Sequence, residues 1–254
     1  MNTPISPTAG VSITPNADRS RLSVTVSDTA EPADATLQYQ VADATGDSER
    51  YTWGIVTISV QDVPDPVSNL RVTEFGDRML RLAWSPGQFN NSPITEYRVT
   101  ATDASGAVAS TTSCTITAGC TVTTPGNGPD HALRLSVVAV NALGESEPTQ
   151  LPGAIWSDVI PPPPAGVAAT PVDHGLRVVW RKPASTAGSA IDSYVVTVAG
   201  FSATVSVSPD DPVGTEYSRI VTNPAIANGS AAGFTVSARN KAPNSLATWN
   251  EAGG

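Results

Sequence analysis

The sequence is poor in the residues that carry chemistry or charge. Of its 254 residues only two are cysteine and two are histidine, 15% are charged and 6% are aromatic. No apolar run approaches the roughly 20 residues of a membrane-spanning helix. The chain also lacks a glycine-rich phosphate loop after a strand and a His-Glu-x-x-His motif. We therefore expect no membrane insertion, no metal site, no cofactor and no catalytic residue, and we expect that the chain is not an enzyme.

The remaining candidates for chemistry do not form a site. His131 and His174 fall in loops of different predicted domains, so a shared catalytic arrangement would require the chain to fold back on itself. Acidic residues gather at 43–49 and 62–65, without the spacing of a calcium loop, and we expect them to form turns and to aid solubility. The formal net charge of −9 repels phosphate backbones, so we expect no nucleic-acid partner.

The residues that are abundant predict β structure. The 22 prolines and 20 glycines mark frequent turns, and the many valines and threonines suit a pleated surface. Short strands joined by tight loops indicate an all-β fold.

Two segments of the chain repeat one pattern of strands. The first copy holds LRLAW at 80–84 and PITEYRV at 93–99, and the second holds LRVVW at 176–180 and AIDSYVV at 190–196. Both copies continue to a strand that ends in Ala-x-Asn, at Asn141 and Asn240. In each strand apolar residues alternate with polar ones, so each strand has one buried face. Two such sheets bury these faces against each other as a sandwich.

These patterns resemble fibronectin type III domains over about residues 64–153 and 161–251. The resemblance rests on the Trp, the Ile-x-x-Tyr-x-Val strand, the Ala-x-Asn strand end and a Gly-x-Ser turn at 144–146. It implies two Ig-like sandwiches in tandem. Leu133 and Ala232 stand where the family usually has a tyrosine, so we expect its corner hydrogen bond to be absent. The second copy also lacks the Gly-x-Ser turn.

The two cysteines, Cys114 and Cys120, are close in sequence and outside any Cys-x-x-Cys motif. They are interpreted as a disulfide, which implies an oxidising compartment, with two free buried thiols as the alternative. The stretch 114–120 is similar to a disulfide-closed turn in the fibronectin type III repeats of large actinobacterial surface proteins. This resemblance implies an extracellular location, at the cell surface or cell wall of a bacterium.

Residues 1–62 do not match that pattern. They hold alternating strands at 22–26, 37–41 and 55–60, and the segment from Tyr39 to Gly46 resembles the C-terminal portion of cadherin-like or Ig-like repeats. We predict three β-sandwich domains, at 1–62 (short, abbreviated or partial), 63–157 and 158–254. The four prolines 161–164 are expected to form a stiff spacer that holds the last two domains apart.

The predicted function is that of an extracellular scaffold or adhesion segment that spaces and presents protein-binding surfaces. The alternative is a spacer in a secreted carbohydrate-active enzyme. Tandem fibronectin type III domains resemble the ligand-binding unit of cytokine receptors, and Trp156-Ser157 matches half of their Trp-Ser-x-Trp-Ser motif. A host protein such as a cytokine is therefore one expected partner, and the chain is expected to be a monomer. The candidate partner-binding or domain-junction residues are Trp156, Ser157, Gly144, Ser146, Pro148 and Trp249.

Overall fold

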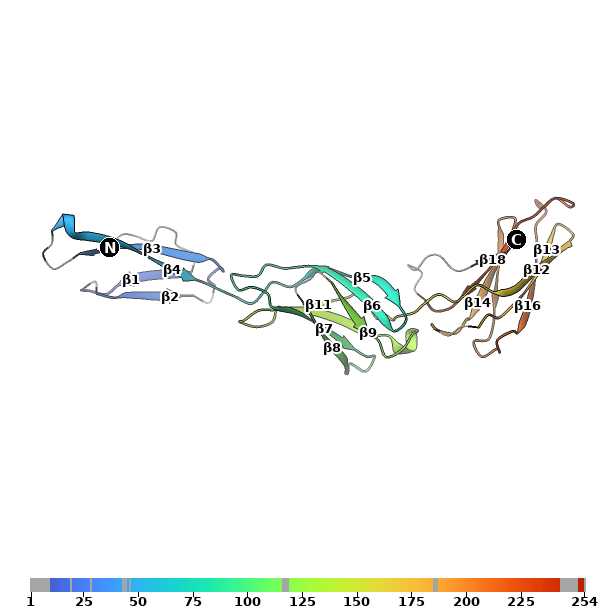
Figure 1. Cartoon of the computed structure of the whole chain (residues 1–254), viewed down its shortest axis with the longest axis horizontal. Helices are drawn as coiled ribbons and strands as arrows, with labels where there is room; N and C mark the ends of the chain where they lie inside the picture. Colours follow the sequence, from blue (N-terminus) through green and yellow to red (C-terminus); the bar gives the residue numbers. More distant parts are fainter. Residues whose placement is uncertain are drawn as a thin grey trace.

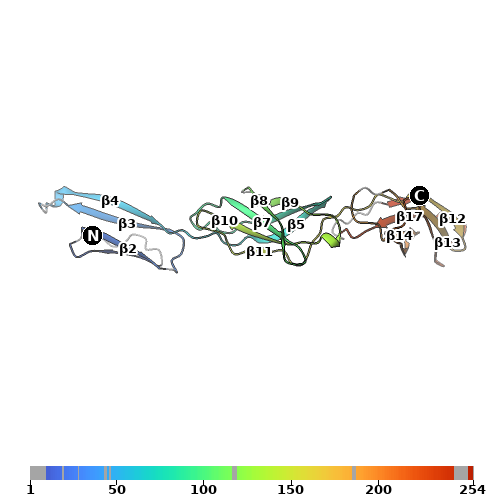
Figure 2. The ribbon, with the colours of Figure 1, turned by 90° about the horizontal axis from the view of Figure 1, so that it is seen from below.

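The structure, a computed structural model, describes residues 10–18, 20–27, 29–42, 45, 47–115, 119–184, 187–242 and 251–253. In this part of the chain the regular structure consists of strands β1 to β18 and two 3-10 turns, η1 (Ser48–Arg50) and η2 (Pro129–His131). The strands form three groups that follow one another along an elongated molecule, in two perpendicular views (Figures 1 and 2). The predicted all-β fold is confirmed.

The first group contains two separate hairpins. Its strands are β1 (Val11–Pro15), β2 (Leu22–Val26), β3 (Asp34–Ala42) and β4 (Tyr51–Ser59). In the described residues β1 pairs with β2 and β3 with β4, each as a two-stranded antiparallel sheet. Ala35 and Leu37 are buried, whereas Trp53 and Ile55 remain 50% and 70% exposed. Two hairpins supply little apolar surface for a core.

The middle group is a sandwich of a three-stranded and a four-stranded sheet. The first sheet has the order β5 (Ser68–Gly76), β6 (Met79–Ser85), β9 (Gly119–Thr123), and the second β11 (Thr149–Gln150), β10 (Arg134–Val140), β7 (Glu96–Thr102), β8 (Val108–Cys114). Alternate residues of β6, β7 and β10 are buried, as their sequence pattern predicts. The rings of Trp84 and Tyr97, from opposite sheets, lie 5.3 Å apart at the centre of this core.

The last group repeats this arrangement. Its three-stranded sheet has the order β12 (Ala165–Val172), β13 (Gly175–Arg181), β16 (Glu216–Thr222), and its four-stranded sheet the order β15 (Phe201–Ser206), β14 (Ser193–Val198), β17 (Phe234–Arg239), β18 (Glu251–Gly253). Trp180 and Tyr194 are fully buried, with ring centroids 5.4 Å apart. Tyr217 joins them, with its ring centroid 5.3 Å from that of Tyr194.

Leu133 stands at the position where fibronectin type III domains usually have a tyrosine, so the hydrogen bond of a tyrosine hydroxyl is absent here. Its side chain is 2% exposed and belongs to the core of the middle sandwich. Its backbone N–H donates to the carbonyl oxygen of Ile155 at 2.7 Å, and the N–H of Ile155 returns a bond of 2.9 Å. A backbone pair therefore holds the segment that leads out of this domain.

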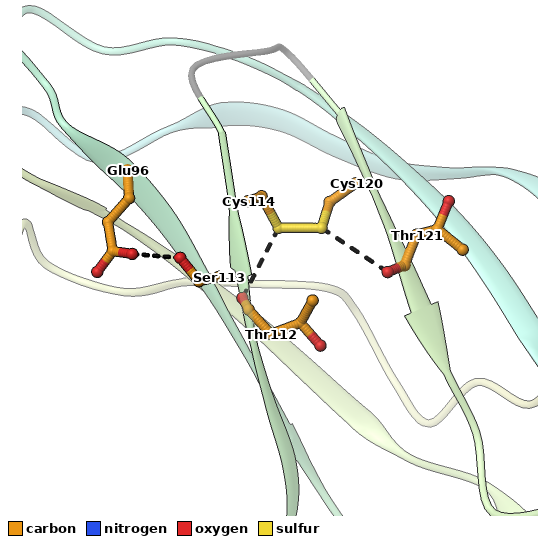
Figure 3. Close-up of a disulfide and its surroundings, with 6 residues drawn as sticks. All are labelled: Glu96, Thr112, Ser113, Cys114, Cys120 and Thr121. Carbon is orange, nitrogen blue, oxygen red and sulfur yellow. Dashed lines mark hydrogen bonds between the residues drawn. A yellow bond between two sulfur atoms is a disulfide. The ribbon is translucent and has the colours of Figure 1, made fainter.

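A disulfide joins Cys114 and Cys120, which confirms the predicted bridge. Cys114 ends β8 and Cys120 lies in β9, and these are edge strands of opposite sheets. Figure 3 shows the bridge crossing between the two strands, with Glu96 and Ser113 beside it. The bridge therefore closes one edge of the sandwich, because it connects the sheets as well as the ends of the turn.

Candidate functional site

Within the residues that it describes, the structure gathers no metal-binding cluster. Those residues include no cluster of three or more histidine, cysteine, aspartate or glutamate side chains that could hold a metal ion. They also include no helix long and apolar enough to cross a membrane. Of the acidic residues, Asp47 accepts a hydrogen bond from the N–H of Glu49, and Asp62 accepts one from the N–H of Val63. Asp43 and Gly46 lie outside the described residues.

The two histidines are in different groups of strands. His131 is exposed in η2 of the middle group. His174 lies between β12 and β13, with its Nδ1 2.8 Å from the carbonyl oxygen of Ile226. Polar side chains are instead concentrated where one group of strands meets the next, and these two junctions form the candidate site.

Asn141, directly after β10, ties the first linker to the middle domain. Its Nδ2 donates to the carbonyl oxygen of Asp62 at 2.7 Å and to that of Ser92 at 3.3 Å. Its Oδ1 accepts a hydrogen bond from the N–H of Leu143 at 2.9 Å. Asn141 is 5% exposed, so water competes little for these bonds. One buried amide therefore fixes the linker, the loop before β7 and the turn after β10.

Asn240, directly after β17, makes the same set of contacts in the last domain. Its Nδ2 donates to the carbonyl oxygen of Val159 at 2.8 Å and to that of Ser189 at 3.1 Å. Its Oδ1 accepts a hydrogen bond from the N–H of Ala242 at 3.0 Å. The repeated Ala-x-Asn motif thus ends each strand in an amide that holds the chain entering the domain. We call this arrangement the asparagine clamp.

Asn91 and Gln61 connect the first group of strands to the middle domain. The Asn91 Nδ2 donates to Asp34 Oδ1 at 3.1 Å and to the carbonyl oxygen of Val60 at 3.2 Å. The Gln61 side chain donates to the carbonyl oxygen of Asn91 at 3.0 Å. Side-chain hydrogen bonds therefore link β3 and the first linker to the loop that precedes β7.

At the second junction Ser157 is bound to the middle domain. Its carbonyl oxygen accepts a hydrogen bond from the N–H of Gly128 at 3.0 Å. Its hydroxyl lies 2.9 Å from Asn127 Oδ1 and 3.1 Å from the carbonyl oxygen of Gly126. The residue has no exposed surface.

Asp158, the next residue, is bound to the last domain. Its Oδ1 accepts hydrogen bonds from the N–H of Val159 at 2.9 Å and of Ser189 at 2.8 Å, and its Oδ2 accepts one from Ser189 Oγ at 2.6 Å. Three donors compensate for burial of this carboxylate, which is also unexposed. Gly188 has a φ of +85°, and a Cβ there would lie 2.6 Å from the carbonyl oxygen of Val159, so glycine is required.

The prolines 161–164 do not separate the last two domains, contrary to the spacer expected from the sequence. Asp158, ahead of them, is already held in the last domain, and the prolines lead from there to β12. The domains touch directly: a Cβ on Gly128 would lie 3.2 Å from Ser189 Cβ. The junction is therefore a contact between loops.

Trp156 also takes part in this contact. Its indole Nε1 donates to the carbonyl oxygen of Lys241 at 2.8 Å, across the junction, and the side chain is partly buried. Lys241 follows the clamp residue Asn240, so the indole reaches the turn that the clamp holds.

The other candidates from the sequence lie elsewhere. Ser146 is 5% exposed, and its Oγ accepts a hydrogen bond from the N–H of Ala139. A Cβ on Gly144 would lie 3.2 Å from Val63, which places this turn at the first junction. Pro148 is exposed, and Trp249 lies outside the described residues.

The structure does not bring the turn at 144–146 and Trp156 together. Glu145 pairs with Val140 at one end of β10, and Ile155 pairs with Leu133 at the other end. A strand of this length spans roughly 20 Å. These candidates therefore belong to opposite ends of the middle domain.

A pocket of about 320 Å³ lies beside the second junction, lined in part by Gly188 and Ser189. Lys182 also lines it, and its Nζ donates to the carbonyl oxygens of Pro209 at 2.8 Å and Asp211 at 2.7 Å.

Sequence reasoning did not identify the asparagine clamps or Asp158 as junction residues. The signal for the clamps was the repeated Ala-x-Asn strand end. The signal for Asp158 was an Asp-Val pair that occurs twice, at 62–63 after the first group of strands and at 158–159 after the middle domain.

Comparison with known proteins agrees with this architecture. The family model described as "Fibronectin type III domain" matches residues 65–152. A human relative, "Neural cell adhesion molecule L1-like protein", is 34% identical over 131 residues, which are 51% of this chain and 10% of the relative. "Neural cell adhesion molecule L1" of Takifugu rubripes is 41% identical over 64 residues, 21% of this chain and 5% of that protein.

Among solved structures, a segment of two fibronectin type III domains from chicken tenascin is 18% identical, with a TM-score of 0.39. The match covers 74% of this chain and 97% of that one.

The chain spans at most about a tenth of the length of these curated relatives. The relatives are animal proteins, so they do not support the predicted bacterial origin or the cadherin-like character of residues 1–62, and both stay predictions. The middle sandwich, with its central Trp84 and Tyr97, is matched over nearly its whole length. Residues 65–152 therefore form a fibronectin type III domain.

Proposed function

We propose that the chain is an extracellular scaffold or adhesion segment that holds protein-binding surfaces at fixed spacing and orientation. In this proposal the domains are 1–62, 63–157 and 158–254, and the last is a second fibronectin type III domain. The observation that carries the proposal is that the middle domain ends at Ser157 and the last domain begins at the very next residue, Asp158. These adjacent residues are both unexposed and are hydrogen-bonded to different domains, so no unbound residue separates them.

Restricted junctions support a scaffold because presentation depends on orientation. If the last domain swung away, the Trp156 indole would lose its acceptor at Lys241 and the contact between Gly128 and Ser189 would open. The asparagine clamps hold the incoming chain at both junctions in the same way. The row of domains in Figure 1 then behaves as a stiff rod.

The proposed partners are proteins that bind the exposed loops and sheet faces. The relatives are named cell adhesion molecules, which supports a protein partner for this chain. A host protein such as a cytokine, and display on a bacterial surface, remain parts of the proposal that rest on the sequence. Trp156 is assigned to the junction, because its indole N–H is already used there.

Distance measurements between domains test the scaffold. Val108 and Val213 are 62% and 65% exposed, in the middle and last domains, and can be replaced by spin-labelled cysteine. Pulsed electron paramagnetic resonance should give one narrow distance distribution for the otherwise unchanged chain. The additional change Trp156→Phe removes the hydrogen bond to Lys241 and should broaden it. Trp53→Phe, at an exposed indole in the first group, is the matched control and should leave it narrow. A broad distribution in the unchanged chain would refute the scaffold.

A further inference from the structure

The strands of the β3–β4 hairpin carry little charge although the chain is strongly acidic. Residues 35–42 and 51–59 contain no aspartate, glutamate, lysine or arginine, although the whole chain has a net charge of −9. The side chains of Trp53 and Ile55 on β4 are largely exposed. Two copies of this chain therefore repel each other only weakly along these two strands.

One edge of β3 carries backbone hydrogen-bonding groups that no strand of the described residues uses. The N–H of Val60 donates to the carbonyl oxygen of Ala33, and the register continues from there with Ala35 opposite Ile58. Hydrogen-bonded pairs alternate along an antiparallel ladder, so odd-numbered residues of β3 bond to β4. The backbone groups of Thr36, Gln38 and Gln40 therefore point to the other edge, where β3 pairs with no strand among the described residues.

This edge lacks the features that usually prevent strand addition. Proteins protect edge strands with lysine, proline, bulges or very short strands. β3 is nine residues long, contains neither lysine nor proline, and pairs with β4 without a register shift. A regular strand of this length can accept another extended strand along its whole edge.

We infer that the free edge of β3 is a self-association surface, on which a second copy of this chain places its own β3 antiparallel. Full overlap of Asp34–Ala42 puts Gln38 of both copies on the two-fold axis, as a hydrogen-bonded pair. The two hairpins then form one continuous four-stranded sheet. This goes beyond the scaffold function, and it differs from the monomer expected from the sequence.

The register fits a second copy. Leu37 faces Tyr39 of the other copy, an aliphatic–aromatic pair of the kind that stabilises sheets. Asp34, the charged residue of β3, is opposite Ala42 in this register, so within β3 no two charged residues are paired.

Two alternatives fit less well, namely residues 1–9 as the strand added to β3, and the outer edge of β4 as the association surface. Residues 1–9 contain Pro4 and Pro7, which have no N–H to give to a ladder. The outer edge of β4 contains Gly54 in mid-strand, which weakens strand pairing, whereas β3 contains no glycine.

Charge-swapped variants of the full chain test the inference, because Gln38 meets its own copy on the axis. Sedimentation equilibrium should show a concentration-dependent dimer of the unchanged chain. Gln38→Lys and Gln38→Glu each place like charges opposite one another and should weaken self-association about tenfold. An equimolar mixture of the two variants should recover a heterodimer. Circular dichroism should show that both variants keep the fold.

Ile55→Lys is the matched control, because Ile55 is the central residue of β4, one strand away from the axis. It should leave the dimer intact. A chain that stays monomeric at millimolar concentration would overturn the inference, and so would a mixture that fails to recover association. Loss of the dimer in Ile55→Lys but not in Gln38→Lys would assign association to β4 and refute the β3 edge.

Discussion

Ser157 and Asp158 are consecutive in the chain and are bound to opposite sides of the second junction. The carbonyl oxygen of Ser157 accepts a hydrogen bond from Gly128 in the middle domain, and the carboxylate of Asp158 accepts two from Ser189 in the last domain. Neither residue is exposed. The single peptide bond between them is therefore the covalent boundary, and movement there must break buried hydrogen bonds.

Asp158→Ala should destabilise the last domain by roughly 1.5–3 kcal/mol, because it leaves the N–H of Ser189 without its charged acceptor. Ser157→Ala should instead loosen the loop around Asn127 in the middle domain. Hydrogen exchange followed by mass spectrometry separates these effects, with faster exchange in β14 and β17 for the first variant and in β6 and β9 for the second. Asp210→Ala, at an exposed turn, is the control. Equal effects on both domains would contradict the assignment.

Removal of the disulfide by replacing Cys114 and Cys120 with serine should lower the free energy of unfolding by about 2 kcal/mol, the chain-entropy value for so short a loop. Urea unfolding of the two proteins measures this difference. Intact mass of the unchanged chain should be two hydrogens below that of the reduced form. Two alkylatable thiols in the native protein would contradict both the bridge and the oxidising compartment.

The stability of the middle domain should fall in acid partly through Glu96. A hydrogen bond from Ser113, and the interaction with Arg98, hold the pKa of Glu96 below its usual range. The folded state thus favours the carboxylate, so this contribution is complete above the ordinary glutamate pKa of about 4.3. It is lost as pH falls through the lower folded pKa.

Carbon-detected NMR titration should show a depressed pKa for Glu96. Ser113→Ala should move that pKa back toward its ordinary value, and Glu96→Gln should flatten the acid limb of the stability curve. An unchanged pKa in Ser113→Ala would show that the hydroxyl is not the main cause.

The Tyr217 hydroxyl should ionise at a higher pH than an exposed tyrosine. Burial raises its pKa to about 12, and the hydrogen bond and charge of Asp211 add to this effect. The folded state holds the phenolic proton more tightly, so the contribution of Tyr217 to stability is complete below the ordinary tyrosine pKa of about 10. It is lost as pH rises to about 12. Phenolate absorbance should contain a component near this pH that Tyr217→Phe removes, and titration entirely near pH 10 would contradict the burial.

The fold could be predicted because its signals are local and repeat. Leu80, Leu82 and Trp84 alternate along β6, and Val178 and Trp180 do the same along β13. Alternation fixes which face of a strand is buried. The disulfide was also predicted from local spacing, although the sequence could not show that the bridge would join two sheets.

The junctions could not be predicted, because their bonds join residues far apart in sequence. Asn141 reaches back to Asp62, and Trp156 reaches forward to Lys241. Proline content indicated where the linkers are, but not that Asp158 would be buried ahead of the prolines. The stiffness of a junction depends on how two loops fit each other, and a strand pattern contains no information about that fit.

The short span of the disulfide has a mechanical consequence. Tension applied to the two ends of the molecule enters the middle domain near Pro64 and leaves it near Ser157. The bridge between Cys114 and Cys120 has a sequence separation of only 6, so it shields just the few residues inside its loop from being pulled straight. An unravelled domain would lengthen by about 3.3–3.6 Å for each remaining residue. The crosslink therefore leaves nearly the whole length of the domain free to extend under load.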